Sequence, residues 1–462
     1  MVLGDTIRAI TGRAASAPPV HGAGPKSEPR AVERQITSAP HGHVLTNIGV
    51  WSRDGKRIVY DVRSTPAGDV FDGTRIEEVD VETGEVRLLY ESKNGAACGV
   101  VTTSPVDERC VFIHGPERPT RDWQYGPAHR QGVMVERGRP GVAVNLDARD
   151  LAPPFTPGAL RGGSHVHTFS GDGRCVSFTY NDAILEHVAA PTAHLADADI
   201  DQRNIGVSFL QHPVAVSRDH PRNHDGVAFS VLVTRTTARP RPGSDEIAKA
   251  CEEGWVGANG YLKPDGTRQA RAIAFRGDVL TDSGQSITEA FIADLPEDLT
   301  IPGDGPLQGT TSRRPLPPKG TVQRRLTRTQ SRRFPGLQGV RHWMRSSPDG
   351  SRIAMLMKDD GGVVQIWTIS PNGGEPQQVT RNPWSIASAF SWSPDGRWIA
   401  YVADNSVFVT HVATGRATRL LPRSSDAVAP RPEACVFSPD GRYIAYVRHV
   451  SPFNQIFVAV PA

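Results

Sequence analysis

Large apolar residues alternate with smaller neighbours in several short stretches of this chain, and a tight polar turn interrupts each stretch. In residues 434–447, Cys435 and Phe437 alternate before the turn, and Ile444 and Tyr446 alternate after it. A period of two is the pattern of a β-strand, because successive side chains point to opposite faces of a sheet. The stretch is therefore predicted to form two antiparallel strands joined by a hairpin.

The turn between these strands reads Ser-Pro-Asp-Gly, and its residues suit a hairpin. Pro439 sets φ at the first corner, Asp440 can bond to its own backbone, and Gly441 takes a position that requires a positive φ. The same unit, complete or with substitutions in the turn, recurs at residues 51–60, 169–178, 346–355 and 392–401.

The spacing of these units predicts the fold. From Ser347 to Ser393 is 46 positions, and from Ser393 to Ser438 is 45. A period of about 45 residues with several strands in each repeat is typical of a β-propeller. Each hairpin is followed by two further strand patterns, so one blade has four strands. Residues 31–462 are predicted to form one all-β domain, a seven-bladed β-propeller of four-stranded blades.

The fourth repeat departs from the pattern. Residues 225–234 are expected to form its inner strand, but no Ser-Pro-Asp-Gly turn follows them. Ser244 suits the N-cap of a helix and Gly254 suits its end, so a helical insertion is predicted near residues 244–254. A long loop rich in proline and glycine is expected near residues 296–320.

The seventh repeat is one strand short. Residues 434–437, 443–447 and 455–460 supply three strands before the chain ends. Residues 33–37, Glu-Arg-Gln-Ile-Thr, resemble the outer strands of other repeats. They are predicted to pair with residues 455–460 as the outermost strand of the last blade, which leaves no open sheet between the first and last blades.

Composition places the chain among ordinary globular proteins. It has 462 residues, a formal net charge of +3 and 38% hydrophobic residues. No apolar run reaches the roughly 18 residues of a membrane span, and the balanced charge does not favour nucleic acid as a partner. Residues 1–30 lack the apolar core of a secretory signal. They are predicted to form a disordered leader, with the protein in the cytoplasm.

The repeated hairpins resemble the Ser-Pro-Asp-Gly propeller repeats of TolB-like proteins. The order of motifs over most of the chain resembles the uncharacterised bacterial YidR-like family, notably in residues 341–350 and 363–367. That resemblance implies the propeller fold and no established reaction. The chain also resembles, more loosely, oligogalacturonate lyase, which is a propeller enzyme. That resemblance implies a site of clustered histidines that bind a divalent metal ion.

Candidate functional residues follow from the direction of the inner strands. Each inner strand runs from the mouth of the central channel to its Ser-Pro-Asp-Gly turn, and propellers bind ligands at that mouth. The position five residues before the turn serine is therefore predicted to lie near the mouth. It holds Asn47, His165, His342 and Glu433 in four different repeats. Asn47 and Glu433 are candidate ligand-binding residues.

The histidines give the most specific hypotheses. His165 and His342 are candidate ligands of a divalent metal ion, since neutral imidazole binds such ions well. His167 lies two residues from His165, and His224 is expected at the start of the fourth inner strand, so both are candidate general bases. The alternative is that these histidines bond to neighbouring blades and have a structural role.

Arginine and aromatic residues could complete a site. Arg341 flanks His342 and could hold a carboxylate in fork geometry, or form a surface ion pair. Trp123 and Tyr125 lie in a polar insertion that opens on the mouth face, where they could stack on a sugar or anchor the loop. Residues 313–333 hold eight basic residues and no acidic one, which suits a polyanion contact or a solvated loop.

Two functions fit these residues. The first is a binding protein that holds a small acidic or carbohydrate ligand, or a protein partner, at the channel mouth. The second is an oligosaccharide lyase or hydrolase that uses the mouth histidines, with or without a divalent metal ion. The sequence contains no GxSxG nucleophile motif and no phosphate-binding glycine loop, and it does not decide between binding and catalysis.

Overall fold

A computed structural model describes residues 31–65, 68–186 and 199–461. Residues 1–30, for which a disordered leader is predicted, lie outside these ranges, so that prediction and the cytoplasmic location derived from it stay predictions. No helix within the described ranges is long and apolar enough to cross a membrane.

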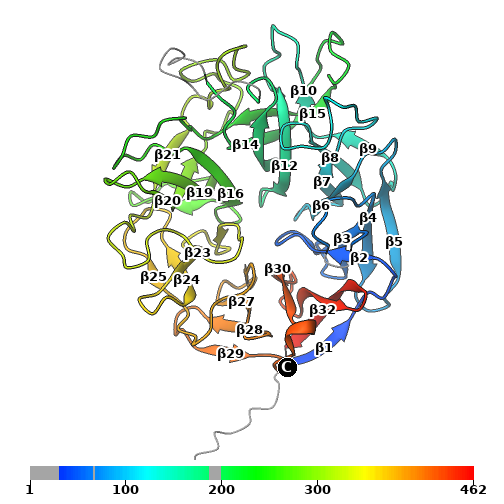
Figure 1. Ribbon diagram of the computed structural model, residues 1–462, viewed down its shortest axis with the longest axis vertical. Coiled ribbons are helices and arrows are strands. Elements are labelled where there is room, and N and C mark those ends of the chain that lie inside the picture. Colours follow the sequence, from blue (N-terminus) through cyan, green and yellow to red (C-terminus); the bar gives the residue numbers. More distant parts are fainter. Residues whose placement is uncertain (1–30, 66–67, 187–198, 462) are drawn as a thin grey trace, which may run out of the picture.

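Seven four-stranded antiparallel sheets surround a central channel, as predicted (Figure 1). Each sheet is one blade, and its strands follow one another from the channel to the rim. Blade 1 consists of β2 (Gly42–Val44), β3 (Arg57–Arg63), β4 (Arg75–Asp80) and β5 (Val86–Glu91), and blade 2 of β6 (Cys98–Thr103), β7 (Arg109–His114), β8 (Gln131–Glu136) and β9 (Ala143–Asn145). Blade 3 consists of β12 (Gly162–Phe169), β13 (Cys175–Asp182), β14 (Asn204–Val214) and β15 (Gly226–Leu232). Blade 4 consists of β16 (Lys249–Trp255), β19 (Ala272–Leu280), β20 (Ser286–Asp294) and β21 (Val322–Arg325).

The remaining three blades complete the ring. Blade 5 consists of β22 (Arg345–Ser346), β23 (Ile353–Lys358), β24 (Val364–Ile369) and β25 (Gln377–Gln378), and blade 6 of β26 (Ser391–Trp392), β27 (Trp398–Ala403), β28 (Ser406–His411) and β29 (Ala417–Arg419). Blade 7 consists of β30 (Pro430–Phe437), β31 (Ile444–Val450), β32 (Phe453–Pro461) and β1 (Ala31–Gln35). Outside the blades are the parallel pair β10 (Ala148–Arg149) and β11 (Ala159–Leu160), the hairpin β17 (Tyr261–Leu262) and β18 (Arg268–Gln269), and a 3₁₀ turn at Asp426–Val428.

Hydrogen bonds within the repeated turn explain why the motif recurs. In the last blade, Ser438 Oγ donates to Asp440 Oδ1 (2.6 Å) and accepts from the backbone N–H of Tyr443 (3.0 Å). The serine therefore ties the turn to the second residue after it, while Gly441 adopts a φ of 74°. The same Ser–Asp bond occurs at residues 52–54, 170–172, 347–349 and 393–395.

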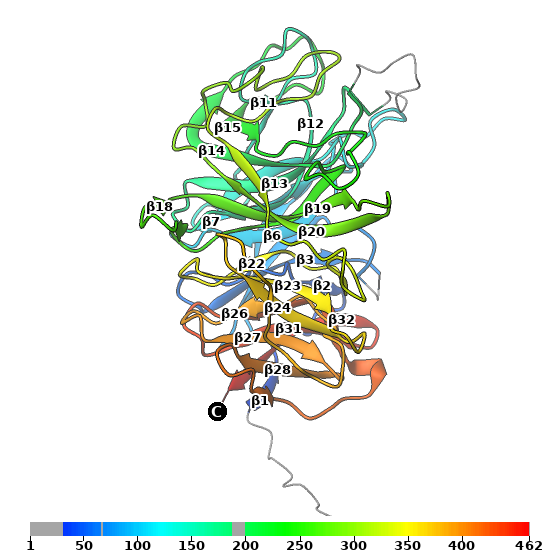
Figure 2. The ribbon, with the colours of Figure 1, turned by 90° about the vertical axis from the view of Figure 1, so that its left-hand side faces the viewer.

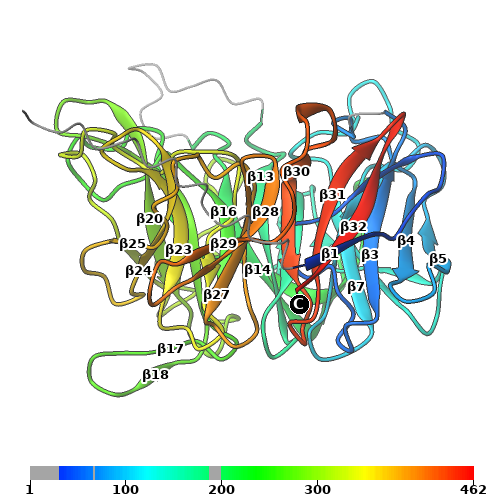
Figure 3. The same ribbon diagram turned by 90° about the horizontal axis from the view of Figure 1, so that it is seen from below.

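The first and the last described strands, β1 and β32, pair in one sheet, which confirms the predicted closure. Strand β1 pairs antiparallel with β32, and Glu33 lies opposite Ala459. Ile36 continues the contact through a backbone hydrogen bond to Ile456 O (2.8 Å). Figure 3 shows β1 beside β32 at the edge of this blade. The last blade is thus completed by the start of the chain.

The predicted helix near residues 244–254 is wrong, because Lys249–Trp255 forms the inner strand β16 of blade 4. This strand pairs with β19 from Lys249↔Asp278 to Trp255↔Ile273. Residues 225–234, predicted as that inner strand, instead contain β15, the outermost strand of blade 3. The helix prediction rested on end signals alone, and pairing with β19 satisfies the backbone instead.

Apolar side chains pack mainly between neighbouring blades. One cluster joins Trp51 and Tyr60 of blade 1 to Val436 and Ile456 of blade 7. Such contacts hold each blade against the next and keep the inner strands in fixed positions around the channel. Figure 2 shows the ring of blades from its side. In residues 296–320, where a long loop is predicted, an isolated bridge joins Pro302 to Pro318.

Candidate functional site

A pocket of about 460 Å³ occupies the predicted mouth of the channel. Blades 1, 2, 3, 5 and 7 contribute to it. Most of the contributing residues lie on or next to an inner strand, and Asp61 lies on the second strand of blade 1. It is formed by Val44, Leu45, Thr46, Asn47, Asp61, Val100, Val166, Val340, Arg341, Trp343, Pro432 and Glu433. The fold therefore brings Asn47, Arg341 and Glu433 to one pocket. His165 and His342, expected at the same level from their positions in the repeats, are not among the residues that line it.

Three consecutive inner strands carry a bulge at the level of this pocket. The central residues Val100, Val166 and Glu252 have φ values of 59°, 57° and 57°. The register of the three strands shifts at these same points. A positive φ is a genuine outlier for a β-branched residue, and such strain clusters at functional sites. The bulges turn two valine side chains to the pocket wall.

The third bulge positions the guanidinium at the pocket edge. Glu252 Oε1 accepts a hydrogen bond from Arg341 Nε (3.2 Å), and the other carboxylate oxygen pairs with Arg276. The Arg341 guanidinium lies 4.8 Å from the centre of the Trp343 ring, and its side chain is 58% exposed. Since one carboxylate serves two guanidinium groups, the edge of the pocket keeps an excess of positive charge.

A buried polar group lies at the level of Asn47. With its amide oriented to match its neighbours, the Asn47 oxygen accepts hydrogen bonds from Arg345 Nη2 (2.9 Å) and Nε (3.0 Å). Burial lowers the pKa of Arg345 to about 9, and the negative charge of Glu253 partly opposes this shift. Burial raises the pKa of Glu253 to about 7, and Thr179 Oγ1 donates to its Oε2 (2.9 Å).

Arg345 marks the boundary between two parts of the channel. A second cavity, of about 230 Å³, lies on the turn side and is lined by Arg345, Met344 and Trp255 among others. Asn47, its partner, lines the mouth pocket. The Asn47–Arg345 pair, from blades 1 and 5, therefore crosses the channel between the two cavities.

His342 is held within its own blade. Its Nδ1 donates to Val340 O (2.9 Å), and its Nε2 accepts from the backbone N–H of Leu356 (3.1 Å). The ring is fully buried, and burial lowers its pKa to about 3. Both nitrogens are therefore used in the fold, which is the structural alternative considered for this residue.

His165 and His167 do not share one strand face, because the bulge at Val166 breaks the alternation between them. His165 is 5% exposed, and burial together with the nearby guanidinium of Arg130 lowers its pKa well below the usual value. His167 is fully buried and its Nε2 lies 3.0 Å from Ser164 Oγ, so it faces the interior between blades rather than the mouth pocket.

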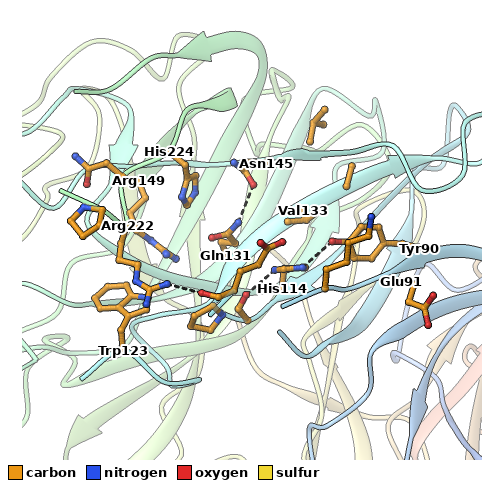
Figure 4. A pocket seen from close by; sticks show the side chains of 18 of the residues that line it. Tyr90, Glu91, His114, Trp123, Gln131, Val133, Asn145, Arg149, Arg222 and His224 are labelled. Atoms are coloured by element: carbon orange, nitrogen blue, oxygen red, sulfur yellow. Dashed lines mark hydrogen bonds between the residues drawn. The ribbon is translucent and has the colours of Figure 1, made fainter. Parts of the chain in front are cut away.

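Trp123 and His224 lie in a different pocket, of about 520 Å³, at the rim of blades 1, 2 and 3 (Figure 4). The expected place of His224 on a fourth inner strand is wrong, since it precedes β15 and bridges to Arg149. Trp123 stacks on His129 with ring centres 3.8 Å apart, and Arg149 and Arg222 lie 5.6 and 5.9 Å from its ring centre. This indole anchors the loop.

Tyr125 belongs to a stack beside the mouth. Its ring lies 4.6 Å from that of Phe71, with Arg63 on the outer side of Phe71 and Arg130 beside Tyr125. Gly99 lies under this stack, because a Cβ there would come within 3.0 Å of Phe71. Tyr125 thus joins the insertion of blade 2 to blade 1, and it is not among the residues that line the mouth pocket.

The basic run at residues 313–333 is mostly paired within the protein. Arg325 bonds to Glu289 (3.0 Å), Arg328 to Asp245 (2.7 Å) and Arg324 to Asp294 (3.2 Å). The free positive charge expected from the sequence is therefore reduced, and the run gives no support for a polyanion contact.

Sequence reasoning missed Glu253 and the three bulges. Glu253 fell inside the predicted helix, so its position carried no signal of burial. Arg345, like Arg341, flanks His342 and suited an anion contact or an inter-blade ion pair, but its contact with Asn47 was not predicted. A positive φ at valine has no sequence signature, because valine favours extended strands.

Comparisons with known proteins match this architecture. A family model described as a protein of unknown function (DUF3748) matches residues 97–224, and the model of the dipeptidyl peptidase IV N-terminal region matches residues 365–451. The chain is 46% identical over 419 residues to the uncharacterized protein YidR of Escherichia coli (strain K12), a match that covers 90% of this chain and 94% of that protein.

Two further similarities are more distant. The Tol-Pal system protein TolB of Desulfosudis oleivorans is 36% identical over 72 residues, which cover 15% of this chain and 16% of that protein. A solved structure of oligogalacturonate lyase in complex with manganese superposes with a TM-score of 0.57 and 12% identity, covering 94% of each chain. At that identity the likeness shows the fold alone.

The residues of this chain do not fit a metal site at the mouth. Within residues 31–65, 68–186 and 199–461, no group of three or more histidine, cysteine, aspartate or glutamate side chains could hold a metal ion. Of the two predicted ligands, His342 already uses both ring nitrogens in the fold. A divalent ion there would have to displace the Leu356 N–H from His342 Nε2.

Proposed function

This chain belongs to the family of the uncharacterized protein YidR of Escherichia coli (strain K12), and we propose that it is a binding protein that holds a small acidic ligand at the mouth of its channel. The observation that carries the proposal is the pocket of about 460 Å³ to which five blades contribute. Concave, mostly apolar cavities with a few placed polar groups are the usual form of small-molecule sites.

The charges at the mouth indicate the class of ligand. Asp61 and Glu433 have arginine partners of their own, Arg63 and Arg431. Arg341 shares Glu252 with a second guanidinium, so it is the exposed cation of this pocket that a ligand carboxylate would best neutralise. Trp343, under Arg341, and the two strained valines would cover an apolar body. A protein partner would use the same groups if it inserted an acidic side chain.

Calorimetry and thermal-shift measurements test this proposal with phenylacetate and galacturonate as probes and phenylacetamide as the uncharged control. We expect at least one carboxylate to bind and to raise the melting temperature, while phenylacetamide has no effect. Arg341→Gln should weaken binding by about tenfold or more, since a charge-assisted hydrogen bond is lost. Arg352→Gln, in the same blade but at its turn, should leave binding unchanged.

Two results would overturn the proposal. One is that neither carboxylate binds. The other is that Arg341→Gln binds the carboxylate as tightly as the parent protein, which would move the site elsewhere on the molecule.

The alternative function is an oligosaccharide lyase or hydrolase, and one observation favours it. His165 Nδ1 is buried without a hydrogen-bond partner among the described residues, so this ring nitrogen is free to contact a substrate proton. Incubation with galacturonate oligomers, with and without chelator, distinguishes the two functions. A rise in the ultraviolet absorbance of an unsaturated uronate, or new reducing ends, that His165→Ala abolishes would favour the enzyme.

A further inference from the structure

The rim pocket, to which blades 1, 2 and 3 contribute, is separate from the channel mouth, and none of its lining residues lines the mouth pocket. It encloses about 520 Å³ between the ends of β5 and β7, the start of β8, strand β9 and the segment before β15. Figure 4 shows Tyr90, His114, Gln131 and Asn145 along its wall. Most of these lining residues fall within the segment 97–224 that one family model matches.

A buried imidazole fixes the hydrogen-bonding role of Tyr90. His114 Nδ1 lies 2.7 Å from Gly115 O, and a carbonyl only accepts, so Nδ1 carries the proton. His114 Nε2 must then accept the hydrogen bond from the Tyr90 hydroxyl (2.9 Å). Burial lowers the pKa of His114, which keeps this tautomer neutral. The Tyr90 oxygen is therefore left with its lone pairs as a fixed acceptor beside the pocket.

A pair of side-chain amides forms the facing part of the wall. Gln131 Nε2 donates to Asn145 Oδ1 (2.9 Å), and Asn145 Nδ2 donates to Asp225 O (3.2 Å). These bonds orient both amides and leave the Gln131 oxygen as an acceptor and one N–H of each amide as a donor. Donors and acceptors thus lie side by side, as recognition of hydroxyl groups requires.

The charged side chains of the lining are balanced in sign and held in place. Arg222 donates to Glu117 O (2.7 Å) and Arg118 O (3.0 Å), and the Glu117 carboxylate accepts from Asn94 (2.9 Å). Besides Arg222 and Glu117, the more exposed charges are Lys93 and Glu91. These are two cations and two anions. Arg149 also lines the pocket, but it is buried and has the buried Asp147 as its counter-charge, so the pocket favours no ligand of strong net charge.

From this arrangement we infer that the rim pocket is a second binding site, for a neutral ligand rich in hydroxyl groups, with the size of one or two sugar rings. The ring of Tyr90 with Val133 and Val144 supplies apolar surface for the C–H face of a sugar. The amides, the Tyr90 oxygen and the balanced charges supply partners for its hydroxyl groups. The inference is independent of the acidic ligand proposed at the mouth.

Ligand-observed NMR and calorimetry with maltose, cellobiose, lactose and chitobiose at millimolar concentrations test this inference. At least one of these sugars should bind to the full-length protein. Gln131→Ala and Tyr90→Phe should each weaken that binding by about three- to tenfold, as expected for the loss of one hydrogen bond. Gln377→Ala removes an exposed amide on β25 and should leave binding unchanged.

Further variants separate this site from the mouth and from loss of folding. Arg341→Gln should bind the sugar as the parent protein does, whatever happens to carboxylate binding. Melting temperatures of the Gln131 and Tyr90 variants show whether they are folded. The inference is overturned if none of the four sugars binds, or if folded Gln131→Ala and Tyr90→Phe proteins both bind as tightly as the parent.

Discussion

The Asn47 carboxamide and the Arg345 guanidinium bond to each other across the channel, through contacts of 2.9 and 3.0 Å. They come from blades 1 and 5, nearly 300 residues apart in the sequence. Arg345 is 4% exposed and Asn47 is 1% exposed, so neither can turn to water. A buried cation without its acceptors is costly, which makes this pair a structural requirement of the channel.

Substitution of Asn47 tests that requirement. Asn47→Ala should lower the free energy of unfolding by about 2 to 3 kcal/mol, because a buried guanidinium loses two hydrogen bonds. Asn47→Asp keeps acceptors for Arg345 and should be less destabilising than alanine. Denaturant unfolding of the three proteins measures the difference. Equal stability of Asn47→Ala and the parent would show that Arg345 does not depend on this contact.

Glu253 should make stability depend on pH. Burial raises its pKa from 4.5 to about 7 in the folded protein. Between these values the folded state binds more protons than the unfolded state, so stability should fall as the pH rises from about 4.5 to about 7. Glu253→Gln removes the titrating group and should flatten this part of the profile. An unchanged profile in thermal melts across that window would assign the dependence to other groups.

Bulge residues should tolerate glycine where their neighbours do not. Val100 has a φ of 59° and is half-buried, whereas Val101 is fully buried on the same strand. Val100→Gly relieves the strain of a positive φ and should change stability by less than about 1 kcal/mol. Val101→Gly should cost about 3 kcal/mol through a cavity. A large loss of stability for Val100→Gly would show that its side chain matters more than the strain.

The two histidines predicted as metal ligands, His165 and His342, should differ in their effect on folding. His342→Ala removes the acceptor of the Leu356 N–H and should destabilise by about 2 kcal/mol or more. His165→Ala removes a ring whose Nδ1 is unpartnered and should cost less. Thermal unfolding of the two variants shows which substitution destabilises the protein more. Manganese should not raise the melting temperature of the parent protein, and a rise that His342→Ala abolishes would contradict the hydrogen-bonding role.

Ring closure should depend on the first described strand. Deleting residues 1–37 removes β1 and Ile36, which packs with Val458, and leaves the edge of β32 open. The loss should exceed about 2 kcal/mol and favour self-association through the free edge. Deletion of residues 1–30 is the control and should leave stability unchanged. Denaturant unfolding measures the stability of both truncated proteins, and size-exclusion chromatography measures their self-association. If the two proteins behave alike, β1 is not needed to close the ring.

The repeated hairpins were visible in the sequence because each is a local unit. Ser438, Asp440 and Gly441 need only their neighbours to form the turn, and the alternation on either side of it records which face is buried. The spacing then predicts the propeller, and the register of Asn47, Arg341 and Glu433 follows from it. Even the closure by residues 33–37 was readable, since outer strands resemble one another.

What the tertiary structure alone decided is how residues from different blades meet. The sequence around Glu253 has helix end signals, but pairing of β16 with β19 makes it a strand. Val166 belongs to a strand by composition, yet a bulge separates His165 from His167. Such choices depend on long-range hydrogen bonds and packing. Only the folded ring therefore places Arg345 opposite Asn47 and His224 at the rim, because no local pattern encodes a contact between distant blades.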